Sequence, residues 1–155
     1  MANWTHYWQK ETMLDPVGMA SGPLDHTASN SFRDRGVSPG DRVYVISCYG
    51  GAFYVVGRLI VDRIVDQQTA ARELPYDPWE AADHILTEPS TRSPQRSDVT
   101  LPMVEVQKLE FISSSGLKYP KFTANGLPDR QTFRGVREIT DSTATTFDRA
   151  LGLLV

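Results

Sequence analysis

The sequence predicts one domain of the α+β class, built on a central β-hairpin with short helices around it. The chain has 155 residues, which suits a single domain spanning residues 1–155. Hydrophobic residues make up 40% of the chain and charged residues 23%, close to the globular average, which excludes disordered and collagen-like chains. Two long runs of β-branched and aromatic residues stand among segments of helical character, and this mixture indicates the α+β class.

The hairpin is the clearest element of the sequence. Residues 38–41 (Ser-Pro-Gly-Asp) form a turn, and residues 42–48 follow as a strand rich in β-branched and aromatic side chains. The glycines of residues 49–52 permit a tight reversal, and residues 53–65 resume the β pattern. Both strands are apolar on both faces, so we expect them in a covered central sheet or small barrel. Gly57, inside the second strand, predicts a bulge or a close backbone approach.

One short helix is expected before this hairpin and another after it. The first covers residues 27–35 and ends at Gly36, a residue common just beyond a helix. The second begins at Asp77 as N-cap, with Pro78 at the first helical position, and ends near Leu86.

The second half of the chain predicts a loop, two strands and a final helix. Residues 88–100 are polar and rich in Ser, Pro and Arg, which indicates a surface loop. Residues 103–112 and 133–139 are expected to be strands. Thr140 then caps a helix whose apolar face is formed by Ala144, Phe147, Leu151 and Leu154.

Charge and hydropathy narrow the classes of partner. The 16 Lys and Arg against 19 Asp and Glu leave a formal net charge of −3, which argues against coating of nucleic acid by bulk positive charge but permits local basic patches. Apolar runs are far shorter than the roughly 20 residues of a membrane-spanning helix, so no membrane partner is expected. The first residues lack the pattern of a secretory signal, and a cytoplasmic location is therefore expected.

Familiar catalytic and cofactor motifs are absent from the sequence, so neither a metal nor a cofactor is expected. A single cysteine, Cys48, excludes an internal disulfide. Cys48 lies in an apolar strand, where a free cysteine usually behaves as a small buried hydrophobe rather than a nucleophile.

Aromatic residues crowd the N-terminus. In a strand, Trp4, His6 and Trp8 would share one face and Tyr7 would lie on the other. Flat rings beside hydrogen-bonding groups suit a nucleobase pocket, because stacking supplies affinity and edge contacts supply discrimination. The alternative is that the tryptophans cover the core.

A polar run, residues 26–33, stands at the start of the first expected helix. Its backbone N–H groups could hold a phosphate or a base edge, although helix capping alone explains Thr27 and Ser29. Asn30 is less easily explained by capping. Arginines that could form basic rims fall into two sets, Arg33, Arg35 and Arg42 in one and Arg130, Arg134 and Arg137 in the other.

Together these segments resemble the EVE domain, a PUA-like domain related to the YTH readers of methylated adenine. The resemblance covers nearly the whole chain. It runs through Tyr7-Trp8, residues 26–33 ahead of residues 37–45, residues 54–59, residues 103–109, and residues 133–140 leading into the last helix.

The resemblance implies a PUA-like, EVE-type fold, a curled mixed β-barrel of about five to six strands flanked by short helices. It also implies a binding module, not an enzyme, that recognises a modified base of DNA or RNA by base flipping into an aromatic cage. Trp8 and Trp4 would stack, Ser29, Asn30 and Ser31 would contact the base edge or phosphate, and Ser47, Cys48 and Tyr49 would line the pocket. The expected nucleic-acid site comprises Trp4, Trp8, His26, Thr27, Ser29, Asn30, Ser31, Arg33, Ser47, Cys48, Tyr49 and Trp79.

The chain departs from the family pattern at the entry to the first helix. Many EVE domains carry Trp-Asp-Gly-Val-Arg-Asn where this chain has Leu-Asp-His-Thr-Ala-Ser-Asn in residues 24–30. Trp79, from the second expected helix, is a candidate to replace the absent tryptophan.

Two alternatives from other classes stand beside the base reader. One is a small nuclease or amide hydrolase on the same scaffold, using Asp25, His26 or His84 with a nearby arginine. The other is a protein-interaction subunit of a defence or RNA-modification system, whose interface would be the loop of residues 88–100.

Overall fold

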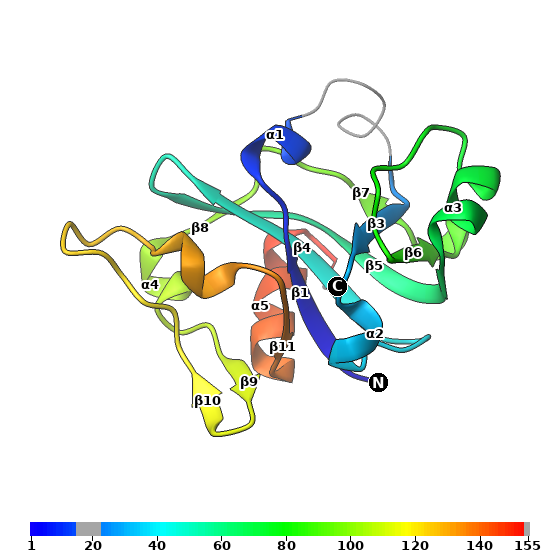
Figure 1. Cartoon of the computed structure of the whole chain (residues 1–155). Coiled ribbons are helices and arrows are strands. Elements are labelled where there is room, and N and C mark those ends of the chain that lie inside the picture. The colour runs from blue at the N-terminus through cyan, green and yellow to red at the C-terminus, as the bar shows by residue number, and fades with distance from the viewer. Residues whose placement is uncertain (15–22, 154–155) are drawn as a thin grey trace.

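The computed structural model describes residues 1–14 and 23–153 and shows an α+β fold with a mixed, largely antiparallel sheet of nine strands (Figure 1). The order is β10-β9-β11-β1-β4-β5-β6-β3, and β8 pairs with β5 off this path. Among the strands of the described residues, only β1 and β4 pair in parallel. The bounds are β1 Asn3–Tyr7, β3 His26–Ser29, β4 Arg42–Tyr49, β5 Ala52–Val65, β6 Asp83–Thr87, β8 Thr100–Leu101, β9 Phe111–Ser113, β10 Gly116–Lys118 and β11 Val136–Ile139; a separate pair joins β2 Pro23–Leu24 to β7 Ser93–Pro94.

Short helices connect the strands. They are α1 Lys10–Met13, α2 Phe32–Arg35, α3 Gln67–Glu73, α4 Met103–Val106 and α5 Asp141–Ala150, with 3-10 turns η1 Pro89–Thr91 and η2 Arg130–Phe133. Within residues 1–14 and 23–153, none of the helices is long and apolar enough to cross a membrane.

The expected barrel of five to six strands is not confirmed, because the nine-stranded sheet is open. Its edge strands are β10 and β3, and no pairing joins them in the described part of the chain. The β9–β10 hairpin and the β3–β6 pair lie at opposite ends of the sheet (Figure 1). All three residues of β10 are exposed, so this edge extends into solvent rather than closing the sheet.

The predicted hairpin is confirmed as β4 and β5, with its reversal at residues 49–52. Gly57 shows both features expected of it. Val45 pairs with Gly57 and Ile46 with Val55, so the register shifts by one residue at this point. A Cβ on Gly57 would lie 2.8 Å from Leu24 Cδ2, which is closer than real side chains approach.

The two helices expected around the hairpin are corrected. The segment predicted as residues 27–35 divides into strand β3 and helix α2, which begins at Phe32 and ends, as expected, at Gly36 with φ 96°. The predicted helix of residues 77–86 is wrong. Its second half is β6, which pairs with both β5 and β3, and the helix lies upstream as α3, capped by Asp66. Burial of all of β6 between two strands outweighs the capping signal at Asp77.

Three further segments differ from their predictions. Residues 103–112 contain α4 and only the start of β9, because Val106 and Leu109 bury their side chains at helical spacing. Residues 133–139 begin as the end of η2 and become a strand at Val136. The loop of residues 88–100 includes β7 and the first residue of β8, and its Ser93 and Gln95 are buried.

The C-terminal helix is confirmed as α5. Thr140 is its N-cap, and its side chain accepts a hydrogen bond from the Thr143 amide at 3.2 Å. Ala144 and Phe147 are buried as expected and Leu151 is half-buried. Leu154 lies outside the described residues.

The sheet has an apolar core on each face. Trp4 and Trp8 pack into one core and Tyr7 against the other, which confirms the expected alternation along β1. Strand β4 contributes to both cores, with Val43 and Val45 in the first and Tyr44 and Ile46 in the second. This double burial explains why its sequence is continuously apolar.

Candidate functional site

The residues expected to bind nucleic acid separate into three groups and one outlier. The first group gathers around β3, the second lies at the β3–α2 junction, and the third lies at the end of β4. The first group is Trp8, His26, Thr27 and Trp79. The second is Ser29, Asn30, Ser31 and Arg33, and the third is Ser47, Cys48 and Tyr49. The outlier is Trp4, which lies apart from all three groups.

The first group forms a buried aromatic cluster. Trp8, only 2% exposed, donates a hydrogen bond from Nε1 to Thr27 Oγ1 at 2.8 Å, and the same oxygen lies 2.7 Å from His6 Nδ1. Trp79 is half-buried and meets Trp8 and His26 edge to face, at centroid distances of 5.9 and 5.0 Å. The structure therefore brings Trp79 beside Trp8, although the segment that carries it is not helical.

Two histidines in this cluster are joined in a chain that sequence spacing did not indicate. His84 Nε2 lies 2.6 Å from Gln67 Oε1 and 3.1 Å from the Ala81 carbonyl oxygen, so it donates to both. His84 Nδ1 must then accept from His26 Nε2, 2.8 Å away. Burial, with the nearby His84 and His6, lowers the pKa of His26 to about 3, and both rings are neutral at pH 7.

The groups of the hydrolase alternative are engaged with other side chains. Asp25 accepts a hydrogen bond from the Tyr76 hydroxyl at 2.9 Å, and it lines a cavity of about 250 Å³ with Arg63. His26 and His84 are fully buried and bonded to each other instead. The described residues contain no group of three or more His, Cys, Asp or Glu side chains that could hold a metal ion.

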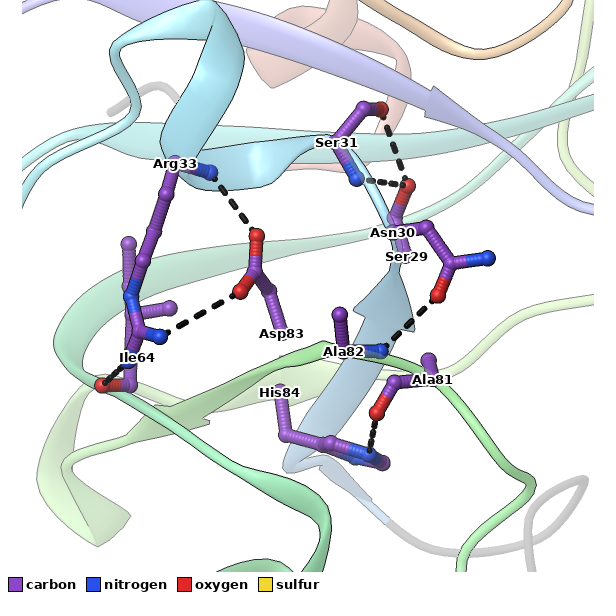
Figure 2. Close-up of polar contacts among 9 residues, drawn as sticks. All are labelled: Ser29, Asn30, Ser31, Arg33, Ile64, Ala81, Ala82, Asp83 and His84. Atoms are coloured by element: carbon purple, nitrogen blue, oxygen red, sulfur yellow. Dashed lines mark hydrogen bonds and ion pairs between the residues drawn. The ribbon is translucent and has the colours of Figure 1, made fainter.

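The second group surrounds the junction between β3 and α2 (Figure 2). Asn30 accepts a hydrogen bond from the Ala82 amide at 2.8 Å, and its amide nitrogen points away from the other residues drawn. Ser29 Oγ contacts Ser31 Oγ at 3.1 Å and accepts from the Ser31 amide at 3.2 Å. Asn30 therefore ties the β3–α2 junction to the segment that leads from Trp79 into β6.

The start of α2 is not a free anion site, which corrects the expectation of a phosphate there. The helix has only four residues, and Asp83 already occupies its first turn by accepting from the Arg33 amide at 3.0 Å. The Arg33 side chain lies 3.4 Å from the other Asp83 oxygen and donates to the Ile64 carbonyl at 2.8 Å (Figure 2). A carboxylate at a helix start satisfies the charge that a phosphate would otherwise meet.

The third group borders a surface cavity of about 250 Å³, which we call the tyrosine cavity. Tyr7, Cys48 and Tyr49 form its wall, and the Tyr7 hydroxyl donates to the Cys48 carbonyl at 3.0 Å. Tyr49 stacks on Tyr54, with centroids 4.6 Å apart and planes within 10°. Burial raises the pKa of the Cys48 thiol, which keeps it protonated and unreactive.

Cations surround the tyrosine cavity. Lys10 lies over the Tyr49 ring, with Nζ 5.3 Å from its centroid, and Arg130 and Arg134 line the same cavity. Glu11 is the acidic residue of this lining. The sequence indicated the two arginines as a basic rim but not Lys10, whose approach depends on the parallel pairing of β1 with β4.

Ser47 supports this cavity without lining it. Its buried hydroxyl donates to the Trp8 carbonyl at 2.7 Å, and the Trp8 amide donates to the Ile46 carbonyl at 2.8 Å. These two bonds extend the β1–β4 pairing, so the chain that follows Trp8 enters α1 beside Cys48 and Tyr49.

Trp4 and the remaining arginines lie elsewhere. Trp4 is 6% exposed and donates from Nε1 to Asp41 Oδ2 at 3.0 Å. Its edge lines a second cavity with Arg35 and Arg137, so neither arginine completes the rim predicted for it. Each predicted set of arginines is therefore divided, since Arg33 pairs with Asp83 and Arg130 and Arg134 line the tyrosine cavity.

Comparisons of the chain with protein-family models, with curated proteins and with solved structures each found no match.

Proposed function

We propose that this protein is a non-catalytic binding module that takes one modified base, flipped out of DNA or RNA, into the tyrosine cavity. The observation that carries the proposal is the meeting of tyrosine rings with three cations, Lys10, Arg130 and Arg134, around one small cavity. The resemblance of the sequence to the PUA-like EVE domain supports the same class of function.

The size of the tyrosine cavity favours a single ring system. Its volume of about 250 Å³ lies below the roughly 300–1,000 Å³ of sites for drug-sized ligands. Stacking on an aromatic side chain offsets part of the cost of unstacking one base from its strand. Tyr54 stacks on one face of the Tyr49 ring and Lys10 Nζ lies over the ring, so a base that stacks on Tyr49 displaces the flexible Lys10 side chain from it.

Polar groups at the mouth of the cavity suit the rest of a nucleotide. Arg130 and Arg134 offer planar forks that pair two phosphate oxygens at once. Neither arginine takes part in an ion pair within the described residues, so both charges are available to a ligand. Gln9 and Glu11 line the same cavity and provide hydrogen-bonding groups for the edge of a base.

The tryptophans have a supporting role in this proposal. Trp4 and Trp8 are buried in the core, so stacking on a ligand is assigned to Tyr49. Trp8 orders the end of β1 through the bond from its Nε1 to Thr27, and so fixes the segment that carries Lys10.

The test measures fluorescence anisotropy of short labelled DNA and RNA strands, each with one modified base, against the matching unmodified strands. We expect a preference for one modification. Tyr49→Ala should weaken binding of that strand roughly 5- to 150-fold, the value of one lost stacking contact. Arg134→Gln should weaken binding of modified and unmodified strands alike, and Arg149→Gln, an exposed arginine of α5, serves as its matched control.

Circular dichroism and the melting temperature establish that each variant is folded. Equal affinity for modified and unmodified strands across the whole panel would overturn the assignment of a base reader. Retention of both affinity and preference by folded Tyr49→Ala would show that the base binds outside the tyrosine cavity.

A further inference from the structure

A second, larger depression is lined by residues of the β9–β10 hairpin. This hairpin lies at one end of the sheet (Figure 1). The depression consists of two adjoining cavities of about 510 and 440 Å³, which share Ser113, Lys118 and Arg137. We call the two cavities together the hairpin groove. Strands β9, β10 and β11 and the turn η2 contribute its walls.

The hairpin groove is basic in a chain whose net charge is −3. Four cations line it, Arg35, Lys118, Lys121 and Arg137, against two carboxylates, Asp129 and Glu138. None of the four cations has an ion-pair partner in residues 1–14 and 23–153. The ion pairs of the described chain instead hold Arg33, Arg58, Arg63 and Arg96.

The opposite end of the sheet has the reverse charge. The cavity beside β6 is lined by four carboxylates and two arginines, and one of these, Arg63, is held by Glu73 at 2.6 Å and by Asp62 at 3.6 Å. Positive charge is therefore in excess at the hairpin end, where four cations face two carboxylates, although the net charge of the chain is −3.

Arg137, like Ser113 and Lys118, belongs to both cavities of the hairpin groove. Its guanidinium carbon lies 5.7 Å from the centroid of the Phe111 ring, which holds the group in place. Its Nε is buried and has no hydrogen-bond partner within the described residues. Burial, with the neighbouring charge of Arg35, lowers the pKa of Arg137, and Arg35 lines the same cavity as Arg137.

An anion with several oxygens would satisfy this arrangement. The guanidinium fork of Arg137 pairs two oxygens of one phosphate, and the charge of Arg35 would favour the same group. Tyr119, which is 52% exposed, lies in the other half of the groove and offers a ring on which a base can stack. A nucleic-acid strand carries phosphates and bases at regular spacing, so it offers a partner both for the Arg137 guanidinium and for the Tyr119 ring.

The hairpin groove and the tyrosine cavity lie on two sides of one short segment. Arg130 and Arg134 line the tyrosine cavity, whereas Asp129, Gln131 and Thr132 line the groove. A strand that places one base in the tyrosine cavity can therefore continue across η2 into the groove.

We propose that the hairpin groove binds the phosphodiester backbone of the strand whose base enters the tyrosine cavity, with Arg137 as its central phosphate contact. This inference rests on the proposed function for the choice of ligand. It adds to that function a binding track several nucleotides long, so affinity depends on the length of the strand.

The test compares strands of three and about twelve nucleotides, each with the preferred base and without it, over a series of salt concentrations. Lys118→Gln and Arg137→Gln should weaken binding of the long strand about threefold to tenfold, equally for both bases. Each should also reduce the steepness of log affinity against log salt by about 0.7–0.9. Binding of the three-nucleotide strand and the preference for the modified base should not change.

Arg92→Gln, in the acidic cavity at the other end of the sheet, is the matched control. Lys118 lies in the exposed strand β10, so Lys118→Gln tests the groove even where loss of Arg137 disturbs folding. Unchanged affinity and salt dependence in folded Lys118→Gln and Arg137→Gln would overturn the groove. The groove would also be overturned if inorganic phosphate displaced the labelled strand at the same phosphate concentration as an unlabelled strand does. The site would then accept isolated anions and not a phosphodiester backbone.

The two proposals fail differently. If the protein shows no preference for a modified base but the Lys118 and Arg137 variants still change the salt dependence, the base reader is overturned and the groove stands. If the preference is present but affinity and salt dependence do not change in these variants, only the groove is overturned.

Discussion

His26 Nε2 lies 2.8 Å from His84 Nδ1, and the two imidazole planes are within 18° of parallel. Because His84 Nε2 already donates to Gln67, the shared hydrogen bond requires a neutral His84 whose Nδ1 accepts from His26. Protonating His84 would set two donors against each other, and protonating His26 would place a charge at its buried Nδ1, which has no hydrogen-bond partner within the described residues. The stability of the fold is thereby coupled to pH.

The first prediction is that stability falls as the pH is lowered below about 6.5. Burial lowers the pKa of His6 to about 4, and burial with the charges of His84 and His6 lowers that of His26 to about 3. Below pH 6.5 the unfolded chain binds these protons and the folded chain does not, so each group costs up to about 1.4 kcal/mol per pH unit. The loss continues until the pH approaches the folded pKa values.

Urea unfolding at pH 7.5, 6.5, 5.5 and 5.0 measures this dependence before most carboxylates titrate. In His26→Gln the slope between pH 6.5 and 5.0 should decrease by about 1 kcal/mol per pH unit, because up to one proton fewer is taken up on unfolding. A wild-type free energy of unfolding that stays constant across this range would contradict buried neutral histidines.

Asp41 is predicted to be essential for anchoring the N-terminus. Its carboxylate accepts from the amides of Ala2 and Ser38 at 2.9 and 3.0 Å, and from Trp4 Nε1 at 3.0 Å. Asp41→Ala leaves these donors without their charged acceptor and should lower the free energy of unfolding by about 2–4 kcal/mol. Asp34→Ala, at an exposed aspartate of α2, should change stability by less than about 0.5 kcal/mol in the same urea experiment.

Asp148 joins the last helix to the central hairpin. It accepts from the Tyr44 hydroxyl at 2.8 Å and from Arg58 Nη1 at 3.1 Å. Asp148→Ala leaves the largely buried Arg58 guanidinium without its carboxylate and should lower the free energy of unfolding by about 3–5 kcal/mol. Tyr44→Phe keeps the ion pair and should lower it by about 1–2 kcal/mol. A double-mutant cycle by chemical denaturation checks the ranking, and equal losses would contradict a dominant role of the ion pair.

Gly57 is predicted to tolerate no side chain. A Cβ there would lie 3.1 Å from both the Pro94 carbonyl oxygen and Ser93 Oγ, in addition to its contact with Leu24. Gly57→Ala should therefore destabilise the protein by about 1–3 kcal/mol through overpacking. Thermal and urea unfolding compare it with Gly126→Ala, where a Cβ meets no atom within 4 Å and only the backbone cost at φ 76° remains. A Gly57→Ala loss no larger than the control would show that β7 can move away.

Local signals in the sequence were sufficient for particular elements of the fold. The hairpin from Arg42 to Val65 follows from its β-branched runs and the two glycines between them, and α5 follows from Thr140 and an apolar face at helical spacing. Capping misled the prediction at Asp77, because β6 gains two neighbouring strands that no local pattern reveals.

The same division holds for the candidate site. The sequence by itself determined which chemistry the chain carries: rings at Trp8, Tyr49 and Trp79, and guanidinium groups at Arg130 and Arg134. Only the tertiary structure decided that Trp8 is buried and that Tyr49 meets both arginines across one cavity. Composition and short-range spacing act along the chain, whereas burial and charge pairing depend on contacts between segments distant in sequence, such as β1 against β4 and η2 against β4.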